Sequence, residues 1–193
     1  MAKSAKTSAT KKPPKGWFMA GLNPELYEAS VDSSHPHSGT KCAHIRSGPN
    51  VKNARQWATL MQQIGPLSYR NKRVRMSFWV RTKDVESWVQ PWMRIDGPEQ
   101  GKSLSFDNMC GRRIKEAADW TEHNIVLDVP EESTNIAFGI MLGGKGDVWF
   151  DDVSFDAVGK NVPVTDCPCS RNSTDGKKPQ NLNFEEGEED DYG

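Results

Sequence analysis

The segment from Trp88 to Asp96 alternates between two kinds of side chain. At period two, one face carries only apolar residues, and the other is rich in aromatic, charged and amide groups: Val89, Pro91, Met93 and Ile95 against Trp88, Gln90, Trp92, Arg94 and Asp96. This predicts a half-buried strand. Its outward face is unusual, because exposed indoles leave a large apolar area in contact with water unless something packs on them. A planar, hydrogen-bonding ligand such as a sugar would suit that face, and a second small core under another strand or loop is the alternative.

The run from Arg73 to Arg81 repeats this alternation. Its apolar set is Val74, Met76, Phe78 and Val80, and its other set is Arg75, Ser77, Trp79 and Arg81. If the two strands pair or lie in one sheet, Trp79, Trp92 and Arg94 share one surface.

Strand-like patterns recur along the rest of the chain, between turns rich in Gly, Pro, Asn and Ser. They cover residues 27–32, 41–46, 57–64, 104–108, 123–129, 135–142 and 148–155. Within the segment 135–142, Ala137 and Gly139 oppose the aliphatic set and would form a shallow floor for a ring. No helical period of useful length appears, so the pattern predicts an all-β sandwich.

Composition and charge narrow the function classes. The formal net charge is -1, which gives no global field for specific nucleic-acid or acidic-membrane binding. No apolar run has the 18 or so residues of a spanning helix, and no signal-peptide core precedes the first strand. The four cysteines are too scattered for a disulfide framework, so free thiols and a cytoplasmic location are expected.

Catalytic motifs are not found, and we expect no enzyme. The sequence contains neither a Gly-x-Ser-x-Gly nucleophile elbow nor a metalloprotease helix motif. On a regular strand, Asp151 and Asp152 would point to opposite faces, which is wrong for paired acid/base chemistry. His35 and His37 lie in a Pro-Gly turn, where exposed loop histidines are expected rather than metal ligands.

Several motifs together resemble a known group. Gly16-Trp17, the run from His37 to Lys41, the aromatic strand pair and the run Val148-Trp-Phe-Asp-Asp-Val-Ser-Phe155 look like the galactose-binding-like jelly roll of carbohydrate-binding modules. The resemblance covers about residues 16–159. Trp92-Met-Arg-Ile-Asp-Gly97 and Leu104-Ser-Phe-Asp-Asn-Met109 are closer to bacterial modules sometimes attached to helix-turn-helix regulators.

The residues and the resemblance together favour a non-catalytic module that binds a carbohydrate or similar small polar ligand. We expect Trp79 and Trp92 to stack on a ring. The hydrogen-bonding candidates are Arg94, Asp96, Gln90 and Asp107, with Arg75 as a second-line candidate. The alternative is a protein-interaction or scaffold module that uses the same face, since Trp and Arg dominate such surfaces.

The resemblance also indicates a circular permutation. Modules of this type begin with a strand reading Asn-Leu-x-Phe-Glu-x-Gly, whereas here Asn181-Leu-Asn-Phe-Glu-Glu-Gly187 stands near the other end. We expect a basic arm at 1–15, the sandwich at 16–159, a linker at 160–180, a completing strand at 181–187 and an acidic tail at 188–193. Two alternatives are a strand-swapped homodimer and an unused stub.

A structural calcium ion is a further implication of the resemblance. In relatives it lies between the glutamate of the first strand, the Ser-Gly turn and an aspartate of the last strand. Residue by residue, these positions are Glu185, the segment from Ser38 to Lys41, and Asp152. Hard oxygen ligands suit calcium, although both acids could equally be ordinary surface residues.

Overall fold

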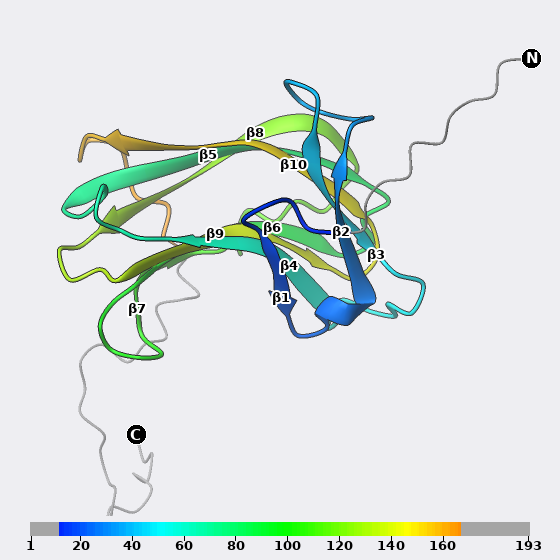
Figure 1. Ribbon diagram of the computed structural model, residues 1–193, viewed down its shortest axis with the longest axis horizontal. Helices are drawn as coiled ribbons and strands as arrows, with labels where there is room; N and C mark the ends of the chain where they lie inside the picture. Colours follow the sequence, from blue (N-terminus) through cyan, green and yellow to red (C-terminus); the bar gives the residue numbers. More distant parts are fainter. Residues whose placement is uncertain (1–11, 167–193) are drawn as a thin grey trace, which may run out of the picture.

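The computed structural model describes residues 12–166, which form two packed five-stranded antiparallel sheets (Figure 1). The first sheet has the order β1-β4-β9-β6-β7, and the second has β2-β3-β10-β5-β8. A 3-10 turn, Pro24–Leu26, is the one helix of the described chain, and no helix there could cross a membrane. The strands are β1 (Phe18–Gly21), β2 (Tyr27–Asp32), β3 (Cys42–Ser47), β4 (Trp57–Ile64), β5 (Lys72–Lys83), β6 (Trp88–Asp96), β7 (Ser103–Asp107), β8 (Ala118–Val129), β9 (Asn135–Gly143) and β10 (Asp147–Val158).

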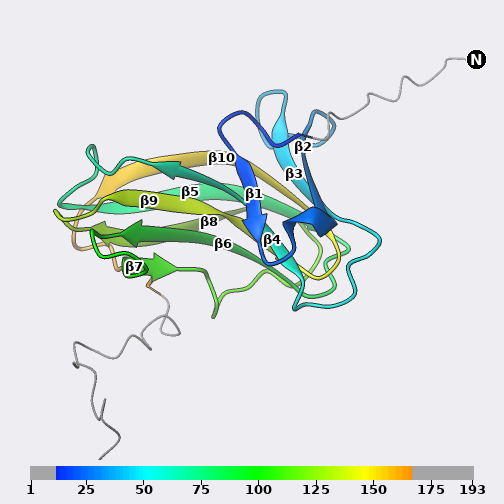
Figure 2. The ribbon, with the colours of Figure 1, turned by 60° about the horizontal axis from the view of Figure 1, so that its bottom comes forward.

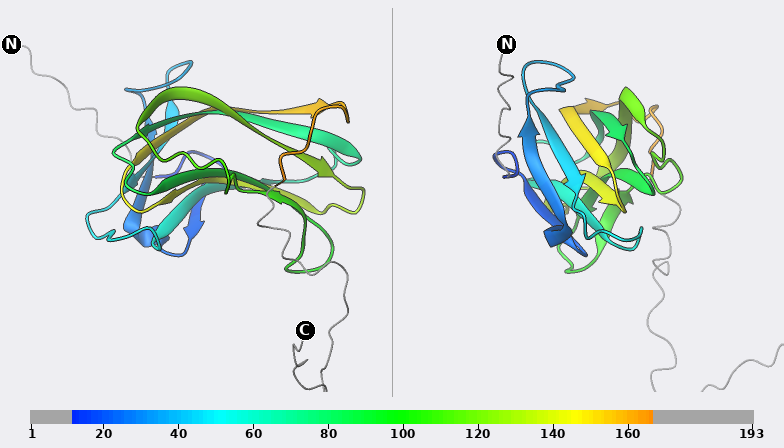
Figure 3. Two further views of the ribbon diagram at one scale, coloured as in Figure 1. Left: turned by 180° about the vertical axis from the view of Figure 1, so that it is seen from behind. Right: turned by 90° about the vertical axis from the view of Figure 1, so that its right-hand side faces the viewer.

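The core is the apolar layer between the two sheets. Figure 3 shows the two sheets from behind and from one side. Each central strand contributes every second residue to it, as period-two side-chain alternation requires. The predicted inward sets of β5, β6 and β9 are confirmed: Val74, Met76, Phe78, Val80, Val89, Met93, Ile95, Ile136, Phe138, Ile140 and Leu142 are all buried. The all-β sandwich predicted from the sequence is therefore the observed fold.

The pattern located most strands closely. It predicted the bounds of β4 and β6 as they are observed, and it missed β1 and the first five residues of β8. β1 has only four residues, and it pairs at the edge of the first sheet with Ala58 to Met61. The start of β8 is largely exposed at the edge of the second sheet. Short or exposed edge strands bury too few residues to show a strong alternation.

The expectation that Trp79, Trp92 and Arg94 share one surface is wrong. β5 belongs to the second sheet and β6 to the first, and the chain crosses between them in residues 84–87. The outward faces of the two strands therefore lie on opposite sides of the sandwich. Figure 2 shows β6 in the layer nearer the viewer with β4, β9 and β7, while β5 and β10 lie behind.

Gly139, in the middle of the first sheet, provides a test of this packing. A Cβ at this position would lie 2.2 Å from the Leu60 carbonyl oxygen and 2.8 Å from the Met61 Cα. The Gly139→Ala substitution should therefore lower the free energy of unfolding by about 1–3 kcal/mol, as overpacking does. Urea denaturation measures this change.

Gly65→Ala is the matched control, because no atom lies within 4 Å of a Cβ added there. We expect it to leave stability unchanged or raise it slightly, through the reduced entropy of the unfolded chain. Equal stability of the two variants would contradict the observed pairing of β4 with β9.

Candidate functional site

The outward face of the first sheet is built from rows of residues that lie opposite one another on neighbouring strands. The central row runs Phe18, Met61, Gly139, Trp92 across β1, β4, β9 and β6. A second row runs Gln63, Ala137, Arg94, Phe106 across β4, β9, β6 and β7. The predicted surface on β6 therefore exists, and it gains side chains from four other strands, β1, β4, β9 and β7.

Trp92 is the anchor of this face. Its side chain is only 6% exposed, and its Nε1 donates a hydrogen bond of 2.8 Å to Oγ1 of Thr59. It packs with Met61 and Ala137 in a second, smaller apolar cluster on the outer side of the sheet, to which Ala20, Phe106 and Met141 also contribute. The indole thus forms the small second core that the sequence left open as an alternative. The small residues beneath it are already covered, since Ala137 is completely buried.

A polar end borders this apolar cluster. Arg94 keeps 43% of its side chain exposed, and its Nε donates to Oδ1 of Asp96 at 2.6 Å. Asp96 also accepts a hydrogen bond of 2.9 Å from Asn135, the residue opposite it on β9. The carboxylate therefore fixes the guanidinium, whose exposed side remains available to a polar ligand.

The structure assigns Gln90 and Asp107 to holding the loop after β7. Gln90 donates from Nε2 to the Asn108 carbonyl oxygen at 2.7 Å, and its side chain is buried. Asp107, also buried, accepts from the Met109 amide at 2.7 Å and forms an ion pair with Arg112. Both polar groups already have partners inside the protein.

Trp79 and Arg75 lie on the second sheet, away from Trp92. The imidazole of His37 stacks on Trp79 with ring centroids 3.8 Å apart, and it also approaches Trp120 at 5.5 Å. One face of the Trp79 ring is thus occupied by the protein itself. Arg75 has no hydrogen bond to its buried Nε. A ligand role for either residue stays a prediction.

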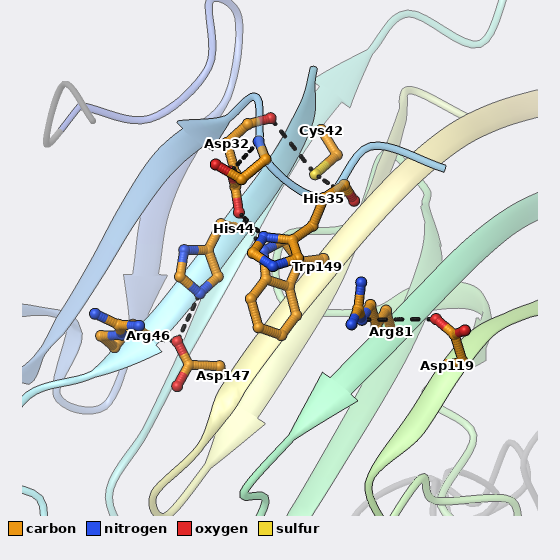
Figure 4. A network of polar contacts seen from close by, with 10 residues as sticks. Asp32, His35, Cys42, His44, Arg46, Arg81, Asp119, Asp147 and Trp149 are labelled. Carbon is orange, nitrogen blue, oxygen red and sulfur yellow. Dashed lines mark hydrogen bonds and ion pairs between the residues drawn. The ribbon is translucent and has the colours of Figure 1, made fainter. Parts of the chain in front are cut away.

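A network of histidine, aspartate and tryptophan covers the outer face of the second sheet around β3 and β10 (Figure 4). Trp149 donates from Nε1 to Oδ2 of Asp32 at 2.6 Å. His44 stacks on the same indole, with the two ring centroids 4.6 Å apart. The Arg81 guanidinium carbon lies 5.6 Å from the centroid of the Trp149 ring. His35 completes the group by contacting both Trp149 and Asp32. This indole is therefore covered by imidazole and guanidinium groups.

Asp151 and Asp152 both reach the turn at residues 37–38, and the expectation of opposite faces is wrong. Asp151 accepts from the backbone amides of His37 and Ser38, at 2.9 and 3.3 Å. Asp152 accepts from His37 Nδ1 at 2.6 Å and Ser38 Oγ at 2.7 Å. The cause is a bulge, because Asp152 has a φ of 49° and the pairing with β5 shifts register there.

The carboxylates of this network have low pKa values. Burial alone would raise the pKa of Asp32, but hydrogen bonds from the Ser34 amide, His35 and Trp149 outweigh it and lower the pKa to about 2. The hydrogen bond from His37, with one from Ser38, lowers the pKa of Asp152. For Asp147, burial is likewise outweighed by hydrogen bonds from His44 and Arg46, so its pKa is lowered. These three acids stay ionised at neutral pH.

Of the predicted calcium ligands, Asp152 and the segment from Ser38 to Lys41 lie within the described residues. Ser38 and Asp152 do lie together, but both carboxylate oxygens accept hydrogen bonds from protein donors. Within residues 12–166, no group of three or more histidine, cysteine or acidic residues could hold a metal. Glu185 lies outside the described residues. These donors alone therefore do not fit calcium, and the ion stays a prediction.

The cysteines differ from expectation at one position. Cys42 is free and buried, and burial, with the negative charges of Asp32 and Asp151, raises the pKa of its thiol to about 12. Such a thiol is not a nucleophile at neutral pH. Cys110 is disulfide-bonded, so the free-thiol prediction is wrong for it. Disulfides persist mainly in oxidising compartments, and cysteine chemistry therefore gives no support to a cytoplasmic location.

Sequence reasoning missed several residues that build these faces. Thr59 and Met61 are outward on β4, and their alternation with Leu60 was a usable signal. His44 and Trp149 meet only because β3 pairs with β10, a contact across about a hundred residues that no local pattern reveals.

The Asp32 interactions predict a pH dependence. Its pKa is lowered from the ordinary value of 3.8 to about 2, so its stabilising contribution is full above about pH 4 and disappears as pH falls through about 2. Asp32→Asn should therefore be less stable than the unmodified protein above pH 4, with the difference shrinking between pH 4 and 2. Urea denaturation across this pH range measures the difference.

Asp156→Asn, at an exposed position on β10, is the control for the loss of one surface carboxylate. A pH-independent gap for Asp32→Asn would contradict the hydrogen bonds assigned to this carboxylate.

Comparisons with known proteins place the chain by sequence and by fold. No family model matches it. It is 38% identical over 172 residues to the uncharacterised HTH-type transcriptional regulator YbfP of Bacillus subtilis, covering 89% of this chain and 57% of that protein. The chain thus spans little more than half the length of the curated relative it matches.

Solved structures show the fold. The C-terminal family 22 carbohydrate-binding module of Clostridium thermocellum Xyn10B superposes with a TM-score of 0.53 at 11% identity, covering 77% of this chain and 89% of that one. A cyclase from Fischerella sp. gives the same TM-score at 12% identity, covering 79% and 89%. With its two antiparallel sheets, the chain has the jelly-roll sandwich fold of carbohydrate-binding modules.

Proposed function

We propose that this chain is a non-catalytic binding module for a carbohydrate or similar small polar ligand, which lies on the outer face of the first sheet. The observation that carries the proposal is the half-exposed Arg94 on the outward side of that sheet, which Asp96 orients and which lies beside an apolar cluster built on the buried Trp92. A solvated sheet face would normally carry polar side chains instead. Apolar surface beside a few fixed polar groups is the composition of a small-molecule site.

Each residue has a distinct role in this proposal. Trp92 is held by Thr59, and it supports the surface from below rather than stacking directly on the ligand. Phe106, half-buried, and Phe18, 42% exposed, supply apolar contact at the two sides. Arg94 supplies charge-assisted hydrogen bonds to hydroxyl groups, with Asp96 holding its orientation.

The comparisons support a saccharide as the ligand class. The similar structure from Clostridium thermocellum is a carbohydrate-binding module in whose cleft conserved residues act in ligand binding. The matched Bacillus protein is named as a transcriptional regulator. A short soluble saccharide, small enough to act as a regulatory signal, is therefore the ligand class that we propose.

A protein-interaction or scaffold role for the same face is the second candidate. The observation that favours it is the pair of large apolar side chains left at its borders, Phe18 at 42% and Leu104 at 37% exposed. Exposed apolar groups beside an arginine are also typical of protein interfaces. Such a role predicts a dimer that dissociates on dilution, or a specific partner protein, and no effect of saccharides.

The direct test is a titration of the protein with short soluble oligosaccharides, including xylo-oligosaccharides, by calorimetry. Arg94→Ala should weaken binding about 10- to 100-fold, the effect of losing a hydrogen bond to a charged group. The fold should stay intact, since this side chain is 43% exposed.

Arg81→Ala and Trp79→Ala are the matched controls on the second sheet, and both should bind with unchanged affinity. Loss of binding in the controls but not in Arg94→Ala would move the site to the second sheet. Product formation in the same mixtures would contradict the non-catalytic assignment.

A further inference from the structure

One half of β10 lacks a neighbour on one side. β10 pairs with β5 along almost its whole length, from Asp147 to Val158, but with β3 only from Asp147 to Phe150. Beyond Phe150, no strand within residues 12–166 pairs with this side of β10. An unpaired strand edge exposes a row of backbone donors and acceptors, which readily accepts another strand.

Burial along β10 changes at the same point. Val148, Trp149 and Phe150 are buried, whereas inward positions further along are not. Phe155 and Ala157 lie opposite the core residues Met76 and Val74, yet Phe155 is only half-buried and Ala157 is exposed. The inner layer of the sandwich is therefore incompletely covered along this half of the strand.

An apolar groove opens at the start of this uncovered edge. It has a volume of about 310 Å³. Its walls are mainly the apolar side chains of Trp17, Val31, Ala43, Phe150 and Val153. Lys41 lines it as well, and Lys15 belongs to the segment that borders it. The acids beside it, Asp151 and Asp152, already accept hydrogen bonds from the turn at residues 37–38.

We propose that residues 181–187 of this same chain add a strand to the second sheet along the uncovered half of β10. The segment reads Asn-Leu-Asn-Phe-Glu-Glu-Gly, so its two large apolar side chains, Leu182 and Phe184, fall on one face at period two. That face fills the groove and covers the inner layer. The neighbouring acids, of which 185–191 contain six, lie near Lys15 and Lys41.

The length of chain outside the structure permits this placement. In Figure 1 the described chain stops at the end of the sandwich toward which the second half of β10 runs. Fifteen steps join Asp166 to Asn181, enough for about 50 Å when extended. A strand of 12 residues such as β10 spans about 40 Å. The segment therefore reaches the edge within its own molecule.

The first test is hydrogen exchange on the full chain, with molar mass measured by light scattering. We expect a monomer in which the amides of 181–187 are protected together with those of 153–157. Exchange of 181–187 at the rate of an unstructured peptide would overturn the proposal. So would a dimer whose protection at 181–187 is lost on dilution, because the segment would then occupy the groove of a second copy.

A pair of variants tests the assigned face. Phe184→Asp should abolish protection at 181–187 and lower the melting temperature by at least about 5 °C, since a charge cannot fill an apolar groove. Asn183→Asp adds the same charge at the adjacent, outward position and should change neither protection nor melting by more than about 1 °C. Equal effects of the two substitutions would overturn the proposal.

Discussion

Each strand of this sandwich buries one face against the opposite sheet, and every large side chain on its other face needs a partner on the outer surface. This requirement is strongest for outward tryptophans, because their indole rings are large. Three such indoles have a partner side chain: Thr59 is hydrogen-bonded to Trp92, His37 stacks on Trp79, and His44 stacks on Trp149. The outer surfaces are therefore organised around covered indoles rather than exposed ones.

Different side chains cover the tryptophans on the two outer faces, and this difference supports the proposed function. On the second sheet, imidazoles cover the indoles, and each imidazole is fixed by a carboxylate. That network satisfies its own polar groups. On the first sheet, the cover is apolar, and the half-exposed Arg94 beside it is oriented by Asp96. The proposed ligand site lies on this face, because partly exposed apolar side chains and a positioned charge remain at its border.

Alternation at period two was enough to predict the fold class, most strand bounds and the inward rows of β5, β6 and β9. It could not predict which sheet a strand joins, because residues 84–87 can lead equally to a neighbour or across the sandwich. It also assumed regular strands, and the bulge at Asp152 redirected a carboxylate. Of the candidate site residues, Arg94 and Asp96 do pair on the outer face of β6, whereas alternation alone could not show that Trp92 is buried and bonded to Thr59.

Chemical-shift mapping would show whether a saccharide lies on the outer face of the first sheet. Backbone and indole NH signals would be followed while a xylo-oligosaccharide that binds is added. We expect shifts concentrated on the outward residues of β6, β7 and β9, including the Trp92 indole, while the signals around Trp149 do not move. Shifts concentrated around Trp79 and Trp149 on the second sheet would contradict it.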